Sequence, residues 1–251
     1  MPCVNIRGCR IGEGRPKVII PIVEPTETAV LEKAAEFSTL RADCVEWRID
    51  CFEGAKDLPA IAHCAAKLRV ALKDQLLLFT FRTKAEGGKA ALTHEEYLHF
   101  IRVVLATDCA DLIDIEFFTA DAELPALIEE AHTAGAAVVC SSHDFHKTPP
   151  RTELVSRMMQ MQRAGADLPK LAVMPQSRTD VLELLAATAE MADLHPETPI
   201  ITMSMGALGA VSRLSGEALG SAMTFANPGQ ASAPGQVSLE VVNEVLDALH
   251  L

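Results

Sequence analysis

Short apolar runs rich in Val and Ile alternate along the chain with longer stretches in which apolar residues recur at helical spacing. This alternation is typical of βαβ units around a parallel sheet. Eight runs predict strands, at 17–23, 44–49, 76–81, 111–117, 136–142, 169–174, 199–205 and 221–226. Eight units within 251 residues predict an α/β fold, a single (β/α)8 TIM barrel that takes up residues 1–251 as one domain.

The stretches between the strands carry recognisable signals for helix starts. Hydroxyl residues stand at expected N-caps: Thr93 with Glu96 as a capping box, Thr148 before Pro149, and Ser177 before Asp180. The amphipathic stretch 238–251 predicts the helix of the eighth unit. These signals place helices where a (β/α)8 barrel requires them.

Two further segments bear on the ends of the predicted barrel. Residues 4–17 show short alternation interrupted by Gly12 and Gly14, which predicts an N-terminal hairpin that closes the bottom of the barrel. Residues 226–236 form the one stretch rich in Gly, Pro and Ser, and they lie where the active-site loops of a barrel emerge. A mobile lid and a plain surface turn are both consistent with this composition.

Charge and composition argue against several kinds of partner. The 22 basic and 34 acidic side chains give a formal net charge of −12, and no run of Lys or Arg forms a patch. We therefore expect neither nucleic acid nor a membrane surface as a partner. The amino-terminal segment has charges and glycines where a signal peptide needs an apolar core, so we expect the chain to stay in the cytoplasm. Seven cysteines without metal-like spacing predict reduced thiols.

Charged residues occur at positions that face the inside of the predicted barrel. In the second predicted strand, Glu46 and Arg48 share one face. The opposite face is apolar and consists of Val45, Trp47 and Ile49. An apolar face suits packing against helices, which leaves the charged pair inside the barrel. The alternative, a half-solvated strand, is less consistent with a parallel sheet, which is buried on both faces.

Two residues at strand ends suggest acid–base and covalent chemistry. Lys170 lies between Pro169 and an apolar run, and lysine is rarely buried without a partner or a purpose. Burial disfavours the ammonium form, and a neutral amine can attack a carbonyl and form an imine that serves as an electron sink. His143 ends the fifth predicted strand, where barrel enzymes keep catalytic groups. The alternatives are a lysine that reaches solvent from its strand and a structural histidine.

Other candidate residues are less specific when each is taken alone. Three arginines at or beyond strand ends suggest a pocket for a carboxylate or phosphate, with surface ion pairs as the alternative; they are Arg48, Arg82 and Arg213. Glu86 precedes two glycines in a loop, and its simplest interpretation is a solvated surface carboxylate. Met203 and Met205 share a strand face, which indicates core filling.

Several common catalytic motifs are absent from the sequence. It contains no nucleotide-binding glycine motif, no H-E-x-x-H and no G-x-S-x-G elbow. Nucleotide, metal and serine-nucleophile mechanisms therefore lose support, but the residues alone leave two interpretations of the barrel open. One is another lysine-imine barrel such as a class I aldolase, and the other is a non-catalytic anion-binding barrel.

Motifs at nearly every strand end are shared with one known family. In order they are EWRID (46–50), LLFTFR (77–82), EGG (86–88), HDFHKTP (143–149), PKLAVMPQS (169–177), ITMSMG (201–206), SRLSGE (212–217) and SAPGQ (232–236). Together these motifs resemble type I 3-dehydroquinate dehydratase, and they span the chain from the second strand to the last loop. One departure is Pro21, where relatives can carry a serine.

The resemblance implies a (β/α)8 homodimer that needs neither metal nor organic cofactor. It implies dehydration of 3-dehydroquinate to 3-dehydroshikimate, the third step of the shikimate pathway, although quinate breakdown uses the same intermediate. By the family's pattern, Lys170 forms an imine with the substrate, His143 transfers protons, and Glu86 orients His143. The implied substrate-binding residues are Glu46, Arg48, Arg82, Met203, Met205, Arg213, Phe225, Ser232 and Gln236.

Overall fold

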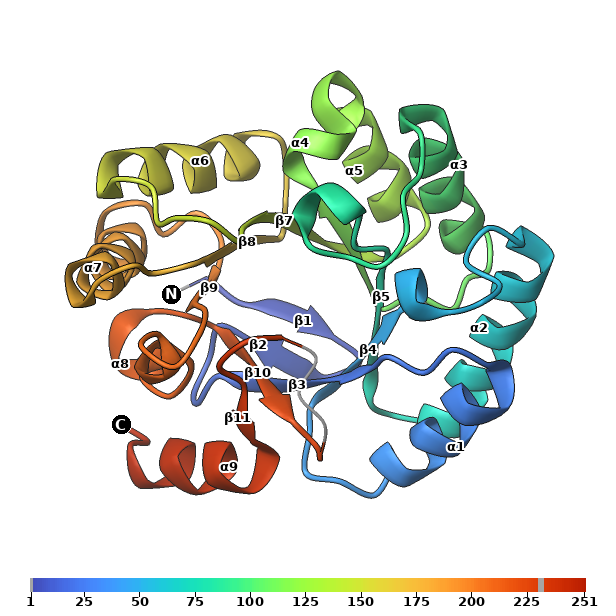
Figure 1. Ribbon diagram of the computed structural model, residues 1–251, viewed down its shortest axis with the longest axis horizontal. Coiled ribbons are helices and arrows are strands. Elements are labelled where there is room, and N and C mark those ends of the chain that lie inside the picture. The colour runs from blue at the N-terminus through green and yellow to red at the C-terminus, as the bar shows by residue number, and fades with distance from the viewer. Residues whose placement is uncertain (1, 230–232) are drawn as a thin grey trace.

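The computed structural model describes residues 2–229 and 233–251, in which eight parallel strands curl into a barrel (Figure 1). The strands are β3 (Lys17–Ile22), β4 (Cys44–Arg48), β5 (Leu76–Thr80), β6 (Leu112–Glu116), β7 (Ala137–Asp144), β8 (Leu168–Val173), β9 (Ile201–Ser204) and β10 (Met223–Asn227). From β3 to β9 each strand pairs with the next along the chain, and β10 pairs with β3. A parallel bridge between Ile200 and Ser221 joins β9 to β10 and closes the barrel. All eight predicted strands are confirmed.

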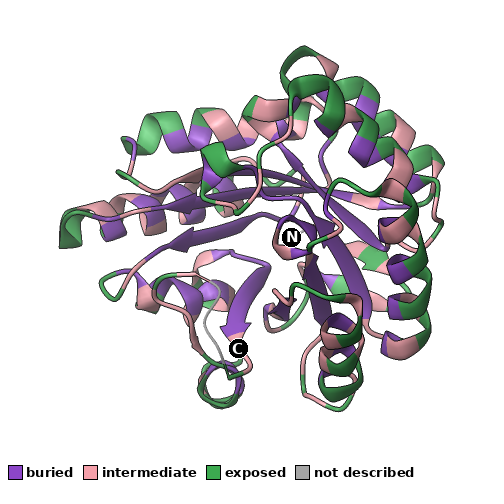
Figure 2. Ribbon diagram, turned by 45° about the vertical axis from the view of Figure 1, so that its right-hand side comes forward, coloured by how far each residue is buried: buried purple, intermediate pink, exposed green. Residues whose placement is uncertain are grey.

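Helices surround the barrel and turn their buried faces toward its strands (Figures 1 and 2). They are α1 (Glu27–Phe37), α2 (Leu58–Leu72), α3 (His94–Leu105), α4 (Phe117–Ala120), α5 (Leu124–Thr133), α6 (Arg151–Arg163), α7 (Arg178–Leu194), α8 (Gly216–Leu219) and α9 (Leu239–Ala248). Short 3₁₀ turns are η1 (Ile49–Cys51), η2 (Lys84–Glu86), η3 (Asp121–Glu123) and η4 (Ala210–Arg213), and a short strand β11 (Val237–Ser238) pairs with β10.

Two of the three predicted N-caps are confirmed. The Thr93 hydroxyl accepts a hydrogen bond from the backbone of Glu96 in a capping box, and Ser177 caps α7. The prediction for Thr148 is wrong, because α6 begins only at Arg151, after Pro150. A residue before proline is driven out of the helical region, so Pro149, which precedes Pro150, cannot open the helix.

Residues along each strand alternate between two cores. On β4 the outward-facing Val45 and Trp47 are fully buried against the helices, as predicted. Inward-facing residues form a separate interior cluster, which comprises Ile11, Ile19, Cys44, Leu76, Leu78, Leu112, Val139, Leu168, Ala172, Ile201, Met203, Met205, Ala222, Met223 and Phe225. The charged residues Glu46 and Arg48 therefore face the barrel interior above this apolar cluster.

The predicted N-terminal hairpin is present. It consists of β1 (Val4–Ile6) and β2 (Cys9–Ile11), which pair antiparallel. At its turn the Arg7 guanidinium donates to the carbonyl of Lys73, which lies shortly before β5 begins, so the hairpin lies at the amino-terminal end of the strands. Ile11 is fully buried in the interior cluster. The hairpin closes the bottom of the barrel and leaves the other end for a site (Figure 1).

All seven cysteines are free in the structure, and Cys44, Cys64 and Cys140 are buried. Within residues 2–229 and 233–251, every helix is too short or too polar to cross a membrane.

Candidate active site

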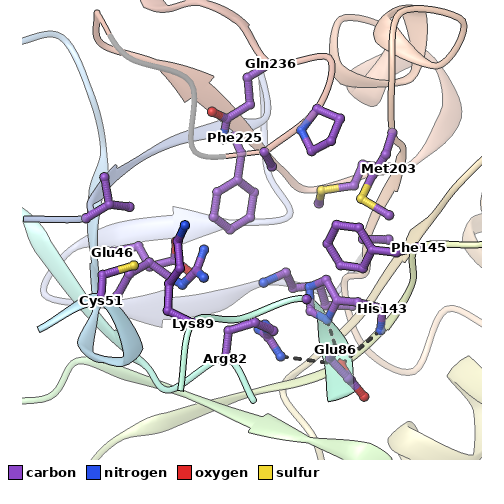
Figure 3. Close-up of a pocket in the computed structure, with 18 of the residues that line it drawn as sticks. Glu46, Cys51, Arg82, Glu86, Lys89, His143, Phe145, Met203, Phe225 and Gln236 are labelled. Carbon is purple, nitrogen blue, oxygen red and sulfur yellow. Dashed lines mark hydrogen bonds and ion pairs between the residues drawn. The ribbon is translucent and has the colours of Figure 1, made fainter. Parts of the chain in front are cut away.

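A cavity of about 660 Å³ opens at the carboxyl-terminal end of the barrel strands (Figure 3). Eleven of the twelve predicted site residues line it; they are Glu46, Arg48, Arg82, Glu86, His143, Lys170, Met203, Met205, Arg213, Phe225 and Gln236. The twelfth, Ser232, lies outside the described residues, as does part of the predicted lid. Parallel strands deliver their carboxyl ends to one face of the barrel, which explains why residues so far apart in sequence converge.

Lys170 is buried inside the barrel, as predicted. It faces inward from β8, and its side chain is 3% exposed. Its Nζ lies 3.0 Å from Asp114 Oδ2 and 4.7 Å from the centre of the Phe225 ring. The neutral amine that the sequence suggested for Lys170 stays a prediction.

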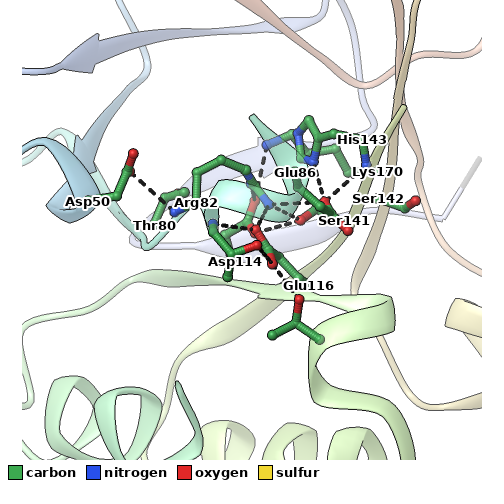
Figure 4. A network of polar contacts seen from close by, with 12 residues as sticks. Asp50, Thr80, Arg82, Glu86, Asp114, Glu116, Ser141, Ser142, His143 and Lys170 are labelled. Carbon is green, nitrogen blue, oxygen red and sulfur yellow. Dashed lines mark hydrogen bonds and ion pairs between the residues drawn. The ribbon is translucent and has the colours of Figure 1, made fainter. Parts of the chain in front are cut away.

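Asp114 anchors a polar network beneath Lys170 (Figure 4). Its Oδ2 also accepts a hydrogen bond from Arg82 Nη2 at 2.7 Å, and its Oδ1 accepts one from the Ser141 hydroxyl at 2.6 Å. Burial alone would raise the pKa of Asp114, but the charges of Arg82 and Lys170 outweigh burial and hold the pKa below its ordinary value. Asp114 is therefore an ionised carboxylate in contact with the lysine.

The structure changes the interpretation of two predicted anion-binding arginines. Arg82 Nη1 donates to Glu116 at 2.8 Å, so this guanidinium is engaged by Glu116 and Asp114. Arg48 forms a bidentate pair with Asp50, at 2.8 and 2.9 Å. A charge inside a barrel needs a partner to offset its desolvation, and both arginines have one within the chain. Both line the cavity, but neither is a free cation.

His143 and Glu86 form a pair at the edge of the cavity. His143 Nδ1 lies 2.8 Å from Glu86 Oε2, and the backbone N–H of His143 donates to the same oxygen at 3.0 Å. Because that oxygen already accepts one hydrogen bond, we assign the ring proton to Nδ1, which leaves Nε2 free to accept a proton. Burial lowers the pKa of His143 well below its ordinary value, and Arg82, Lys170 and Arg48 lower it further.

Glu86 is buried, so its interpretation as a solvated surface carboxylate is wrong. Glu86 is 6% exposed, and burial raises the pKa of its carboxyl group to about 8. The short turn η2 ends at Gly87 in the left-handed region (φ 85°), and a side-chain carbon there would lie 2.4 Å from the Phe145 ring. Only glycine fits this turn, which directs Glu86 back toward His143.

Arg213 differs from the other two arginines because no carboxylate in the described part of the chain pairs with it. It is 1% exposed, its Nη2 donates to the carbonyl of Pro234 at 3.2 Å, and its Nε is buried without a partner. Burial lowers its pKa to about 10. Lys89 also lines the cavity and likewise forms no ion pair among residues 2–229 and 233–251 (Figure 3). An anion in this cavity would meet both cations.

Sequence reasoning missed the carboxylates that pair with the site cations. On β6, Asp114 and Glu116 share one strand face with Leu112, and the residues of the opposite face are apolar. The same argument that placed Glu46 and Arg48 inside the barrel could therefore have identified Asp114 and Glu116. Lys89 lies in a loop, where no periodicity indicates its direction.

The chain is similar to known proteins of one family. The chain matches the family model described as Type I 3-dehydroquinase over residues 18–251. It is 47% identical to the 3-dehydroquinate dehydratase of Bacillus subtilis, with 100% of this chain and 98% of the relative covered. It is 44% identical to the Salmonella typhimurium protein of the same name, with 100% and 99% covered.

Solved structures of similar proteins have the same fold. The type I 3-dehydroquinate dehydratase of Clostridium difficile, solved with covalently modified comenic acid, superposes with a TM-score of 0.96 at 42% identity, over 99% of this chain and 98% of that one. The Enterococcus faecalis enzyme superposes with a TM-score of 0.93 at 41% identity, over 99% and 100%.

Proposed function

The chain belongs to the type I 3-dehydroquinase family, and from this premise we propose that it dehydrates 3-dehydroquinate to 3-dehydroshikimate through an imine on Lys170. The observation that carries the proposal is a buried lysine in the same cavity as a histidine whose Nδ1 lies against Glu86 and an arginine that has no carboxylate partner among residues 2–229 and 233–251. This set matches a ketone substrate that carries a carboxylate and must lose a proton.

The reaction follows from the chemistry of the imine. The Lys170 amine adds to the substrate ketone, and loss of water gives a protonated imine. His143 then takes a proton from the neighbouring carbon, and the electron pair of that C–H bond moves toward the nitrogen to form an enamine. The enamine expels the hydroxyl group, which leaves as water with the proton from His143. Hydrolysis of the product imine frees Lys170.

Glu86 prepares His143 for both proton transfers. Its carboxyl oxygen accepts a hydrogen bond from the Nδ1–H group, with 2.8 Å between Oε2 and Nδ1, and this hydrogen bond fixes the ring tautomer. The lowered pKa of His143 keeps the imidazole neutral and able to act as a base near pH 7. Loss of Glu86 is therefore expected to slow turnover without preventing imine formation.

The remaining cavity residues are proposed to bind the substrate. Arg213 takes the carboxylate, because its guanidinium has no carboxylate partner in the described residues. Met203, Met205 and Phe225 form apolar walls, and Glu46, Arg48, Arg82, Ser232 and Gln236 contact the hydroxyl groups, as the family resemblance implies. The donors of Arg82 already bind carboxylates, so its contribution is charge and not a new hydrogen bond.

Reductive trapping tests the proposal. The protein is incubated with 3-dehydroquinate and borohydride, the adduct is mapped by mass spectrometry, and the absorbance of the conjugated enone product is followed. We expect a reduced adduct on Lys170 together with enone formation. Lys89 lines the same cavity and is the internal control. An adduct on Lys89 alone would contradict the mechanism. No adduct and no enone would favour an aldolase, tested with aldol substrates, or an anion-binding barrel.

We also infer from the chain length and the amino-terminal segment that residues 1–251 fold as one cytoplasmic domain, and from the family resemblance that the enzyme is a homodimer of the shikimate pathway. The closed ring of eight βα units supports one domain. Light scattering during gel filtration should give twice the chain mass of 27.0 kDa. A mass of one chain would contradict the dimer.

A further inference from the structure

Asp114 is the carboxylate with which Lys170 forms an ion pair in the described part of the chain. Neither predicted catalysis nor predicted substrate binding uses this residue. Its side chain is fully buried, and three donors surround it: Lys170 at 3.0 Å, Arg82 at 2.7 Å and the Ser141 hydroxyl at 2.6 Å (Figure 4). Charge-assisted hydrogen bonds of this length are strong and directional.

These groups are held by the rigid part of the fold. Asp114 lies on β6, Ser141 on β7 and Lys170 on β8, three neighbouring strands. Ser141 and Lys170 are direct partners in the register of β7 and β8. A side chain on a strand keeps its direction far better than one on a loop. The contact between Asp114 and Lys170 is therefore a fixed feature of the site.

We propose that Asp114 is a positioning residue for Lys170, which holds Nζ in the cavity and stabilises the positive charge that this nitrogen carries as an ammonium and again as a protonated imine. The inference rests on the proposed imine chemistry. Asp114 opposes the loss of the ammonium proton to water before attack, and it favours the charged imine after attack. Arg82 and Ser141 donate hydrogen bonds to the same carboxylate and so weaken its electrostatic interaction with the lysine.

The pH dependence of trapping separates this role from a structural one. The rate of borohydride adduct formation on Lys170 is measured against pH in the unaltered enzyme and in Asp114→Asn, which keeps the shape of the side chain and removes its charge. We expect the midpoint of the profile to move to lower pH by about one unit or more, because the amine no longer has a carboxylate that favours its charged form. An unchanged midpoint would overturn the inference.

Glu116→Gln is the matched control. Glu116 lies on the same strand and binds the same arginine, Arg82, at 2.8 Å, but it does not contact Lys170. We expect its trapping profile to keep the midpoint of the unaltered enzyme. Equal shifts in both variants would overturn the inference, because they would assign the effect to the summed charge of the cluster. If the unaltered enzyme forms no adduct, the proposed function fails instead.

A second variant covers the case in which Asp114→Asn does not fold, as judged by circular dichroism. Ser141→Ala removes the 2.6 Å donor from Asp114 and keeps its charge. The carboxylate then acts more strongly on Lys170, and the trapping midpoint should move to higher pH. A midpoint that stays in place or moves to lower pH would overturn the inference.

Discussion

The two halves of the barrel interior differ in chemistry although the same strands build both. The amino-terminal half is apolar, and residues such as Ile19, Cys44, Leu76 and Leu168 fill it above the hairpin residue Ile11. The carboxyl-terminal half is ionic and comprises Glu46, Arg48, Arg82, Glu86, Asp114, Glu116, His143, Lys170 and Arg213. A strand therefore provides packing at its start and chemistry at its end.

The amino-terminal half of the interior is the lower half, and the carboxyl-terminal half is the upper half. The two halves contribute to stability in different ways. Apolar burial in the lower half favours folding directly. Buried charges in the upper half carry a desolvation penalty that their mutual attraction only offsets, so ion pairs such as Arg82 with Asp114 are weak evidence for stability. The upper half is retained for the reaction, and changes in the two halves should have separable effects.

Removal of the lysine from the upper half should have the largest effect. Lys170→Ala is expected to lower turnover by about 10⁴-fold or more, because it removes the amine that is proposed to form the imine. Enone absorbance measures turnover, and circular dichroism checks the fold. His143→Ala is the comparison variant, since it should turn over slowly but still give a borohydride adduct. Near-normal turnover of Lys170→Ala would refute the mechanism.

Truncation in the lower half should affect stability and leave the chemistry intact. Ile11→Ala removes a fully buried side chain of the hairpin and should lower the free energy of unfolding by about 2–5 kcal/mol. Urea denaturation measures this loss, and kcat should remain that of the unaltered enzyme. Val70, which is 77% exposed, provides the control Val70→Ala, with an expected change within about 0.5 kcal/mol. Equal losses in both variants would contradict the assigned role of the hairpin.

The pH dependence of kcat should report the environment of His143. Its pKa is lowered in the folded protein, so the neutral base persists as pH falls through 6.5, the ordinary value, and is lost only at more acid pH. At saturating substrate, where Lys170 is held as the imine, kcat should stay level through pH 6.5 and then fall about tenfold per pH unit. A decline centred at or above pH 6.5 would contradict the buried, neutral imidazole.

The smallest effect is expected at the mouth of the cavity. Lys89→Gln removes a cation that has no ion pair within the described residues, and it should lower kcat/KM for an anionic substrate roughly threefold at low salt. High salt should remove the difference, because it screens exposed charges. Lys84→Gln, an exposed neighbour outside the cavity, is the control and should show no change. The same loss in both variants would point to net charge instead of position.

The sequence allowed much of the fold to be predicted but less of the electrostatics. Short apolar runs rich in Val and Ile identified all eight strands, and the family resemblance identified eleven residues that the structure gathers in one cavity. The pairing of Arg48 with Asp50 and of Lys170 with Asp114 was missed. The burial of Glu86 was missed as well, because its loop sequence alone is equally consistent with solvent.

The sequence by itself determined the barrel, its order of strands and the family, because these depend on local periodicity and on residue identity at strand ends. Only the tertiary structure decided which cations are paired and which remain available. Asp114 and Lys170 are 56 positions apart, and their contact depends on the closure of strands β6 to β8 side by side. Charges interact through space, so the chain must fold before Arg213 can be distinguished from Arg48 and Arg82.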